Sequence, residues 1–353
     1  IRPDARLILV GDPGQLVSVE AGAVLDDIVG PARGAAAGNP LTDGGSTAGR
    51  PVADASPDGR PARGGPENDV PAAEAASAGS DANSLPPGGL ADAVVVLRRN
   101  HRSGPRIAAV AEAISAGDAD GTVTALRAGA PQVTWWPVDA AGPGATDDVR
   151  DRAVGAGRAV FEAAAAKDPA GALAALARFR VLCAHRHGPY GASWWTRSIA
   201  GWLAAAVPGF DASREWYVGR PLLVSANDYG LRLFNGDTGV VVADGPGGAV
   251  AAFDHADGPM TYAPTRLGTV DTVHAMTIHK AQGSQFTDVV VVLPPPTSPL
   301  LTRELLYTGL TRARANVVLL GTEESVRRAV ERPAGRATGL RERLWGDADT
   351  LRP

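Results

Sequence analysis

Short apolar runs rich in valine and leucine recur along the chain, with few polar residues inside them. Such runs are typical of strands buried on both faces of a parallel sheet. They predict strands at 6–10, 94–97, 132–138, 179–184, 222–225, 270–276, 289–293 and 317–320. Helical patterns lie between them, at 23–29, 105–115, 150–176, 194–206, 323–332 and 339–345. Strands that alternate with helices predict an α/β fold with a parallel, doubly wound sheet.

Two stretches depart from this alternation. Residues 31–92 are rich in Gly, Pro, Ala, Ser and Asp and contain no aromatic residue. They cannot bury enough apolar surface to offset the entropy of ordering, so we expect a disordered insertion there. Residues 236–268 contain short apolar runs separated by Gly-rich turns, which predict a small β meander or barrel inserted into the larger sheet.

Composition narrows the class of protein only slightly. The formal net charge is −4, but residues 31–93 carry four Arg and eight Asp or Glu, so the remainder is neutral. A protein that grips nucleic acid in a local channel needs no overall basic charge, so this balance does not exclude DNA. The one cysteine, Cys183, excludes a disulfide framework and a cysteine-based zinc site. With no signal segment or long apolar span, we expect a soluble, cytoplasmic protein without membrane partners.

Polar blocks stand at the ends of several predicted strands. Residues 277–286 read TIHKAQGSQF, and residues 306–314 read LYTGLTRAR. A tight Gly-Asp-Pro-Gly-Gln-Leu loop at 11–16 follows the first strand, and Asn-His-Arg-Ser at 100–103 follows the second. Such junctions are where the nucleotide sites of α/β proteins gather. The blocks therefore predict a nucleotide or nucleic-acid site.

Together these blocks resemble the C-terminal half of a superfamily 1 DNA helicase, and most closely the RecD family, the alpha subunit of exodeoxyribonuclease V. Residues 11–22 resemble helicase motif III, 97–103 motif IV, 277–286 motif V and 306–314 motif VI. The segments at 181–191 and 219–239, the latter containing LFNGDTG, are similar to RecD and its relatives.

The resemblance also implies a domain plan, with a RecA-like parallel sheet lobe that carries a small SH3-like β insertion. A residual part of a first RecA-like lobe would occupy 1–30 and 93–98, on either side of the disordered insertion at 31–92. The second RecA-like lobe would occupy 99–235 and 269–332, the SH3-like insertion 236–268, and a tail helix 333–353.

The resemblance further implies roles for single residues. Arg102 and Arg312 would stabilise the charge that develops on the γ-phosphoryl oxygens of ATP, because guanidinium groups bind such oxygens bidentately. Gln15 would sense the γ-phosphate. The remaining nucleotide-site residues would be Gly11, Asp12, Gly283 and Gln285, although relatives usually carry glutamate where Gln285 stands. The DNA contacts would be Thr277, His279, Lys280 and Asn227.

The sequence lacks a P-loop, the segment that binds the phosphates of ATP. A P-loop needs Gly-x-x-x-x-Gly-Lys-Ser/Thr, and neither Lys167 nor Lys280 lies in such a context. No Asp-Glu pair follows an apolar strand to hold Mg²⁺, and no residue cluster predicts a metal site. We therefore expect a fragment, the C-terminal part of an ATP-dependent 5′–3′ DNA helicase, whose main ATP and Mg²⁺ elements lie elsewhere. Alone, it should not hydrolyse ATP.

The resemblance implies a role in double-strand break repair and recombination. The expected partners are single-stranded DNA, double-stranded DNA ends, and RecB- and RecC-like subunits. Two alternatives stay open. One is a conjugative relaxase-helicase of the TraA type, which shares these motifs. The other is a degenerate chain that binds DNA or partner subunits without hydrolysing ATP.

Overall fold

A computed structural model describes residues 5, 7–12, 14–16, 24–30, 93–95, 104–129, 131–335 and 339–345. The chain divides into two compact units. The smaller unit comprises 1–11, 24–99 and 339–353, and the larger comprises 12–23 and 100–338. The predicted disordered insertion at 31–92 lies outside the described residues.

The smaller unit contains helices α1 (Val24–Val29) and α10 (Leu340–Trp345), which confirm two predicted helices. The indole nitrogen of Trp345 donates a hydrogen bond to the carbonyl oxygen of Asp27 at 2.9 Å, so the two helices pack together. The strand predicted at 6–10 is wrong for its described residues, because residues 7–10 are exposed and form no strand. Residues 94–95 likewise form none. A buried parallel strand needs ladder partners, and no described strand pairs with these residues.

The larger unit is built on a five-stranded parallel sheet in the order β1-β10-β9-β2-β8. Its strands are β1 (Val133–Trp136), β2 (Phe179–Cys183), β8 (Ala275–Thr277), β9 (Phe286–Val292) and β10 (Ala313–Leu320). All its neighbouring strands run parallel. The predicted fold class, α/β with a parallel sheet, is confirmed.

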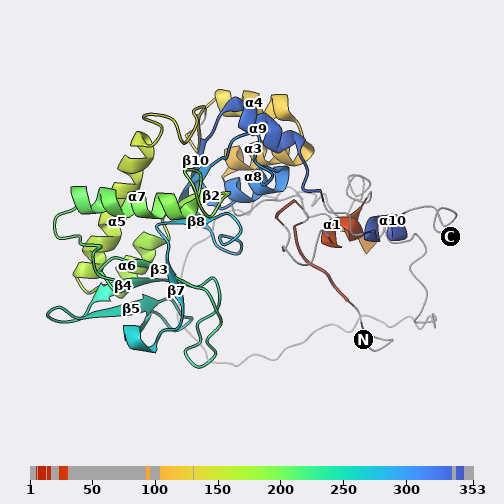
Figure 1. The fold of residues 1–353 in the computed structure, drawn as a ribbon. Helices are drawn as coiled ribbons and strands as arrows, with labels where there is room; N and C mark the ends of the chain where they lie inside the picture. Colours follow the sequence, from red (N-terminus) through yellow and green to blue (C-terminus); the bar gives the residue numbers. More distant parts are fainter. Residues whose placement is uncertain are drawn as a thin grey trace, which may run out of the picture. The chain divides into compact units, whose positions relative to one another are not determined.

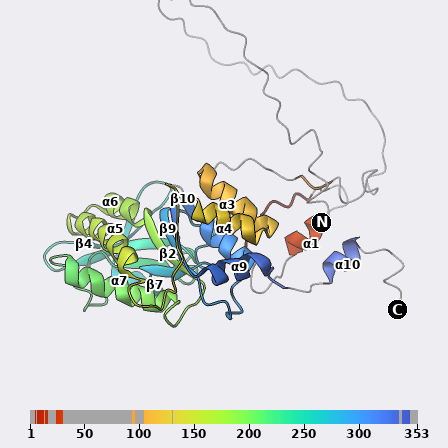
Figure 2. The same cartoon turned by 90° about the horizontal axis from the view of Figure 1, so that it is seen from above.

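Helices cover both faces of this sheet (Figures 1 and 2). One face carries α3 (Pro105–Ala116), α4 (Ala119–Arg127), α8 (Arg303–Leu310) and α9 (Glu323–Glu331). The other face carries α5 (Asp147–Ala165) and α7 (Ala192–Ala206). Along β9, Val289 and Val291 pack with the first group of helices, whereas Val290 and Val292 pack with the second. Successive side chains point to opposite faces, so burial on both faces explains the continuous apolar run.

A second, antiparallel sheet has five strands in the order β6-β5-β4-β3-β7. Its strands are β3 (Pro221–Val224), β4 (Thr238–Ala243), β5 (Ala249–Phe253), β6 (Met260–Tyr262) and β7 (Val270–Thr272), and the 3₁₀ turn η3 (Pro264–Arg266) lies before β7. Helix α6 (Pro169–Leu176) packs with α5 against β4. None of the helices among the described residues is long and apolar enough to cross a bilayer.

The antiparallel sheet extends beyond the predicted insertion at 236–268 on both sides. It takes in β3, which was predicted for the larger sheet, and β7. The strand predicted at 270–276 is divided, because β7 joins the antiparallel sheet and β8 the parallel one. A short apolar run does not reveal which sheet will bury it, so the sequence pattern could not place β3 and β7.

Candidate functional site

The turn between β8 and β9 carries the TIHKAQGSQF block. Ile278 and Ala281 are fully buried and anchor the turn in the core. The hydroxyl of Thr277 accepts a hydrogen bond from the backbone amide of Lys280 at 3.2 Å. Gly283 ends the turn with φ of 84°, a left-handed conformation that other residues resist. The local sequence therefore fixes the turn and leaves its polar side chains at the surface.

Lys280 is the exposed cation of this turn. Its side chain is 43% exposed, and its ammonium nitrogen lies 2.7 Å from a carboxylate oxygen of Asp271 in β7. Exposed ion pairs of this kind contribute little stability, so a stronger anion can displace the carboxylate. Thr277 and His279 are both partly buried beside it. This surface therefore offers a hydroxyl, an imidazole and an ammonium group over four consecutive residues.

Helix α8 carries the LYTGLTRAR block against the same turn. Thr302 caps the helix, because its hydroxyl accepts from the amide of Leu305 at 3.3 Å. A Cβ placed on Gly309 would lie 3.1 Å from the side chain of Ile278. The glycine thus allows close packing of α8 on the turn.

Arg312 follows α8 and is almost completely buried, with 5% of its surface exposed. Its Nε donates to the carbonyl oxygen of Thr308 at 3.1 Å, and Nη1 donates to that of Ser284 at 3.3 Å. Its Nη2 donates to the side-chain oxygen of Gln15 at 2.9 Å. The guanidinium group therefore joins α8, the end of the TIHKAQGSQF turn and the loop at 12–16.

The carboxylate of Asp12 holds the loop at 12–16 in its conformation. Asp12 accepts hydrogen bonds from the amide of Gly14 at 2.9 Å and from the side chain of Gln15 at 3.0 Å. The phenol of Tyr307 also donates to Asp12, at 3.2 Å. These bonds orient Gln15 toward Arg312.

The backbone of this loop is fixed at Leu16, which is buried. Its amide donates to the hydroxyl of Thr308 at 2.8 Å, and its carbonyl accepts from the side chain of Gln282. The described residues of this loop accordingly belong to the larger unit. Long-range side-chain bonds from α8 and from the turn hold the loop there.

The structure thus brings together three of the predicted site residues, Asp12, Gln15 and Arg312. The predicted Gln285 lies next to Ser284 and accepts from Nε of Arg314 at 3.3 Å. Gly11 falls in the smaller unit, and Arg102 lies outside the described residues.

Asn227, predicted to contact DNA, lies in the loop between β3 and β4. Its side-chain oxygen accepts from the amide of Asn235 at 2.8 Å, and its nitrogen donates to the phenol of Tyr229 at 3.4 Å. Both bonds stay within the loop, so Asn227 shapes this loop.

Three residues of the site were not predicted from the sequence: Gln282, Tyr307 and Thr308. Thr308 is a fully buried polar residue in a helix. Buried polar groups are nearly always hydrogen-bonded, and here the partner is the loop at 12–16. In the sequence, only the position of these three residues inside the two polar blocks could have pointed to them, because their hydrogen-bond partners lie more than 260 positions away.

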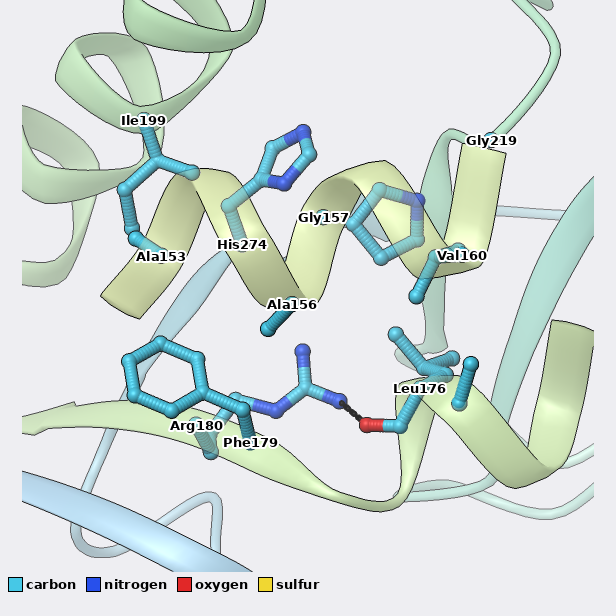
Figure 3. A pocket seen from close by; sticks show the side chains of 12 residues that line it. Ala153, Ala156, Gly157, Val160, Leu176, Phe179, Arg180, Ile199, Gly219 and His274 are labelled. Carbon is cyan, nitrogen blue, oxygen red and sulfur yellow. Dashed lines mark hydrogen bonds between the residues drawn. The ribbon is translucent and has the colours of Figure 1, made fainter. Parts of the chain in front are cut away.

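A small cavity of about 30 Å³ lies elsewhere, between α5, α6 and β2, and none of the predicted site residues lines it (Figure 3). Figure 3 shows Arg180 reaching the carbonyl of Leu176, and Arg180 also donates to the carbonyl of Val273. His274 on its wall bonds to the phenol of Tyr217 at 2.9 Å. A cavity of this size has room for little more than water. The cavity lies where the chain passes from the antiparallel sheet to the parallel sheet.

The sequence of this chain is similar to those of several known proteins. Residues 272–320 match the UvrD-like helicase C-terminal domain. The chain is 42% identical over 344 residues to RecBCD enzyme subunit RecD of Mycolicibacterium smegmatis, covering 98% of this chain and 50% of that protein. It is 45% identical over 347 residues to the same subunit of Mycobacterium tuberculosis, covering 98% and 49%. The chain thus spans about half the length of the curated relatives it matches.

These relatives confirm the resemblance to RecD and favour it over the relaxase-helicase alternative. Similarity to solved structures is weaker. Pif1 helicase from Candida albicans is 14% identical with a TM-score of 0.36, over 70% of this chain and 59% of that one, which is too low to carry an inference.

Proposed function

We propose that this chain, which resembles RecD subunits over nearly its whole length, contributes one half of an ATP site and a single-stranded DNA surface to an ATP-dependent 5′–3′ DNA helicase. The observation that carries the proposal is the hydrogen bond between Gln15 and Arg312, which unites two blocks 297 positions apart. The division into a residual first lobe and a second lobe is part of the same proposal.

On the nucleotide side, Arg312 and Gln15 would hold the terminal phosphate of ATP. Nη2 of Arg312 donates to the side-chain oxygen of Gln15 at 2.9 Å, and the amide nitrogen of Gln15 donates to Asp12 at 3.0 Å. A phosphoryl oxygen would replace Gln15 as the acceptor from Arg312, and the amide nitrogen of Gln15 would turn from Asp12 to donate to it. Bound ATP supplies the bond whose cleavage drives the motor, and guanidinium groups stabilise the charge that develops there. Arg102 is proposed as a second arginine, and Gly11, Asp12, Gly283 and Gln285 as the surrounding residues. Among the described residues no cluster is placed to hold a metal ion, so the proposal assigns Mg²⁺ to no residue here.

On the DNA side, Thr277, His279 and Lys280 would contact the phosphates and bases of a single strand. The same turn continues into Gln282 and Ser284, which bond to the loop at 12–16 and to Arg312. One short turn therefore carries the proposed DNA contacts and also bonds to the residues of the proposed nucleotide site. A change in the contacts of Arg312 would move the DNA-binding end of the turn, which is the coupling that a motor requires.

The proposed partners follow from the relatives. The proteins of M. smegmatis and M. tuberculosis are named as RecD subunits of a RecBCD enzyme. We propose that this chain likewise acts with RecB- and RecC-like subunits on double-stranded DNA ends, in double-strand break repair and recombination.

The DNA surface is tested by the equilibrium affinity of the 353-residue chain for a labelled single-stranded oligonucleotide. The chain has two lysines, so Lys280→Gln has a natural matched control in Lys167→Gln, on an exposed position after α5. Lys280→Gln should weaken binding and lower the salt dependence, measured as the slope of log K against log salt, by about 0.7, the value for one lost phosphate contact. The control should change neither. Equal affinity and slope for both variants would contradict the proposal.

A further inference from the structure

Two aromatic side chains are exposed in the loop that joins β3 and β4 of the antiparallel sheet. The chain's Phe, Tyr and Trp residues all lie in the described part, and of these only Tyr229 and Phe234 are exposed, by 77% and 47%. They contact each other edge to face, with ring centroids 6.2 Å apart. A single exposed apolar residue is ordinary, but an exposed aromatic pair in contact indicates a binding surface.

The loop that presents this pair is held in place on both sides. Asp228 and Leu233 exchange two backbone hydrogen bonds of 2.7 and 3.0 Å, and Leu233 is buried beneath the loop. The phenol of Tyr262 donates to the carbonyl of Leu231 at 2.9 Å. The rings of Tyr229 and Phe234 are therefore exposed on a hairpin that hydrogen bonds and a buried side chain hold in place.

The loop begins beside the proposed DNA-binding turn. Leu223 of β3 pairs with Asp271 of β7, and Asp271 is the partner of Lys280. Two residues beyond Leu223, the amide and hydroxyl of Ser225 both donate to the carbonyl of Thr269, at 3.2 and 2.9 Å. The surface therefore continues from Lys280 across the end of β7 to the start of the loop.

A hollow of about 100 Å³ lies along this path. It is lined by loop residues 226–228, 231 and 233 on one side and by residues 267–270 on the other. Arg232 in the loop and Arg266 next to the hollow are both exposed. The loop's carboxylates, Asp228 and Asp237, accept backbone amides at 3.0 and 2.7 Å and brace the loop itself.

We propose that Tyr229 and Phe234 form a base-stacking site for the single strand that crosses the TIHKAQGSQF turn. The inference rests on the proposed function and deepens it. Aromatic faces stack on bases of any sequence, while neighbouring arginines attract the backbone phosphates, so the chemistry fits single-stranded nucleic acid. The tryptophans do not provide such a platform. Trp195, for example, is fully buried in the core, and the others are at most partly exposed.

The test compares the affinities of the chain for a labelled oligothymidylate and for an oligonucleotide of the same length made of abasic sugars. Wild type should bind the thymidylate more tightly, because only that strand can stack. The double variant Tyr229→Ala, Phe234→Ala should lose about fivefold or more in affinity for the thymidylate, the equivalent of one stacked base, and little for the abasic strand. Tyr229→Phe should keep wild-type affinity, since it keeps the ring.

Met260→Ala is the matched control, because Met260 is an apolar side chain on the antiparallel sheet that is 45% exposed. It should change neither affinity. If the double variant keeps wild-type affinity for thymidylate while Lys280→Gln weakens binding, the stacking site is overturned and the proposed function stands. Equal losses for both strands would also overturn stacking. If wild type binds neither strand, both proposals fall.

Discussion

At the residue scale, the candidate nucleotide site depends on bonds between side chains far apart in sequence. The buried guanidinium of Arg312 meets Gln15, and the phenol of Tyr307 meets Asp12. Hydrogen bonds to charged groups contribute about 1.5–3 kcal/mol each, and their geometry orients the partner. The site is therefore preformed around Arg312.

His274 yields a prediction at the same scale. Burial, together with the smaller effect of the charge of Arg180, lowers the pKa of its imidazole from 6.5 to about 3. The unfolded chain then binds more protons than the folded chain below pH 6.5, so stability falls as the pH drops from about 6.5 toward 3. His274→Gln removes this group, and its melting temperature should fall less between pH 7 and pH 5 than that of wild type.

The control is His187→Gln, which changes an exposed histidine in the loop after β2. Its pH profile should follow wild type. A wild-type pH profile for His274→Gln, measured by thermal unfolding in matched buffers, would show that His274 is not buried in its neutral form.

Sequence reasoning at this scale singled out Arg312, Gln15 and Asp12, which the structure brings together, because each stands in a motif that the RecD resemblance covers. It missed Gln282, Tyr307 and Thr308 as partners, since a hydrogen bond to a residue on a distant segment leaves no local pattern. Periodicity and composition show which face of a helix or strand is buried and where the element ends. The partner of a side chain in a long-range hydrogen bond depends on the three-dimensional fold.

At the scale of elements, α8 is the piece that holds the site together. Its Thr308 and Tyr307 bind the loop at 12–16, and its Gly309 packs on the TIHKAQGSQF turn. The helix therefore positions both proposed ligand surfaces, although its own side chains would contact neither ligand.

Thr308→Val tests this role with little change of volume. The hydroxyl that accepts from the amide of Leu16 is lost, and an unsatisfied buried amide costs about 1–3 kcal/mol. Hydrogen exchange in the peptide covering residues 12–16 should become faster by about fivefold or more. Thr311→Val is the control, because the hydroxyl of Thr311 bonds only to carbonyls of α8. Equal exchange in both variants would show that Thr308 does not hold the loop.

The elements themselves were largely predictable. The strands β9 and β10 come from apolar runs whose alternate residues face opposite helix layers, and α5 and α6 are separated at Asp168, whose carboxylate caps α6. Helix α4 was missed, because Gly121 and two threonines weaken its helical pattern. The division of 270–276 between two sheets also escaped prediction, since contacts such as the bond from Arg180 to Val273 are tertiary.

At the scale of the whole molecule, the larger unit joins two sheets through the segment from β7 to β8, which leads directly into the TIHKAQGSQF turn. At one end of this segment, β7 pairs with β3, which leads into the loop that carries the exposed aromatic pair. At the other end, the carbonyl of Ser284 in the turn accepts a hydrogen bond from the buried Arg312. This arrangement supports the proposal that DNA contact and ATP hydrolysis are coupled through the turn.

The most direct test of the central claim is the kcat of DNA-stimulated ATP hydrolysis in a helicase that joins this chain to a P-loop lobe. To make the joined protein, this chain would replace the matched half of the M. smegmatis RecD relative. Arg312→Ala should lower kcat by about 10³-fold or more, the effect of removing an arginine finger. Arg328→Ala, an exposed arginine on α9, should leave it unchanged, and the 353-residue chain alone should show no turnover. A wild-type kcat for Arg312→Ala in the joined protein would contradict the claim that this chain supplies half of the ATP site.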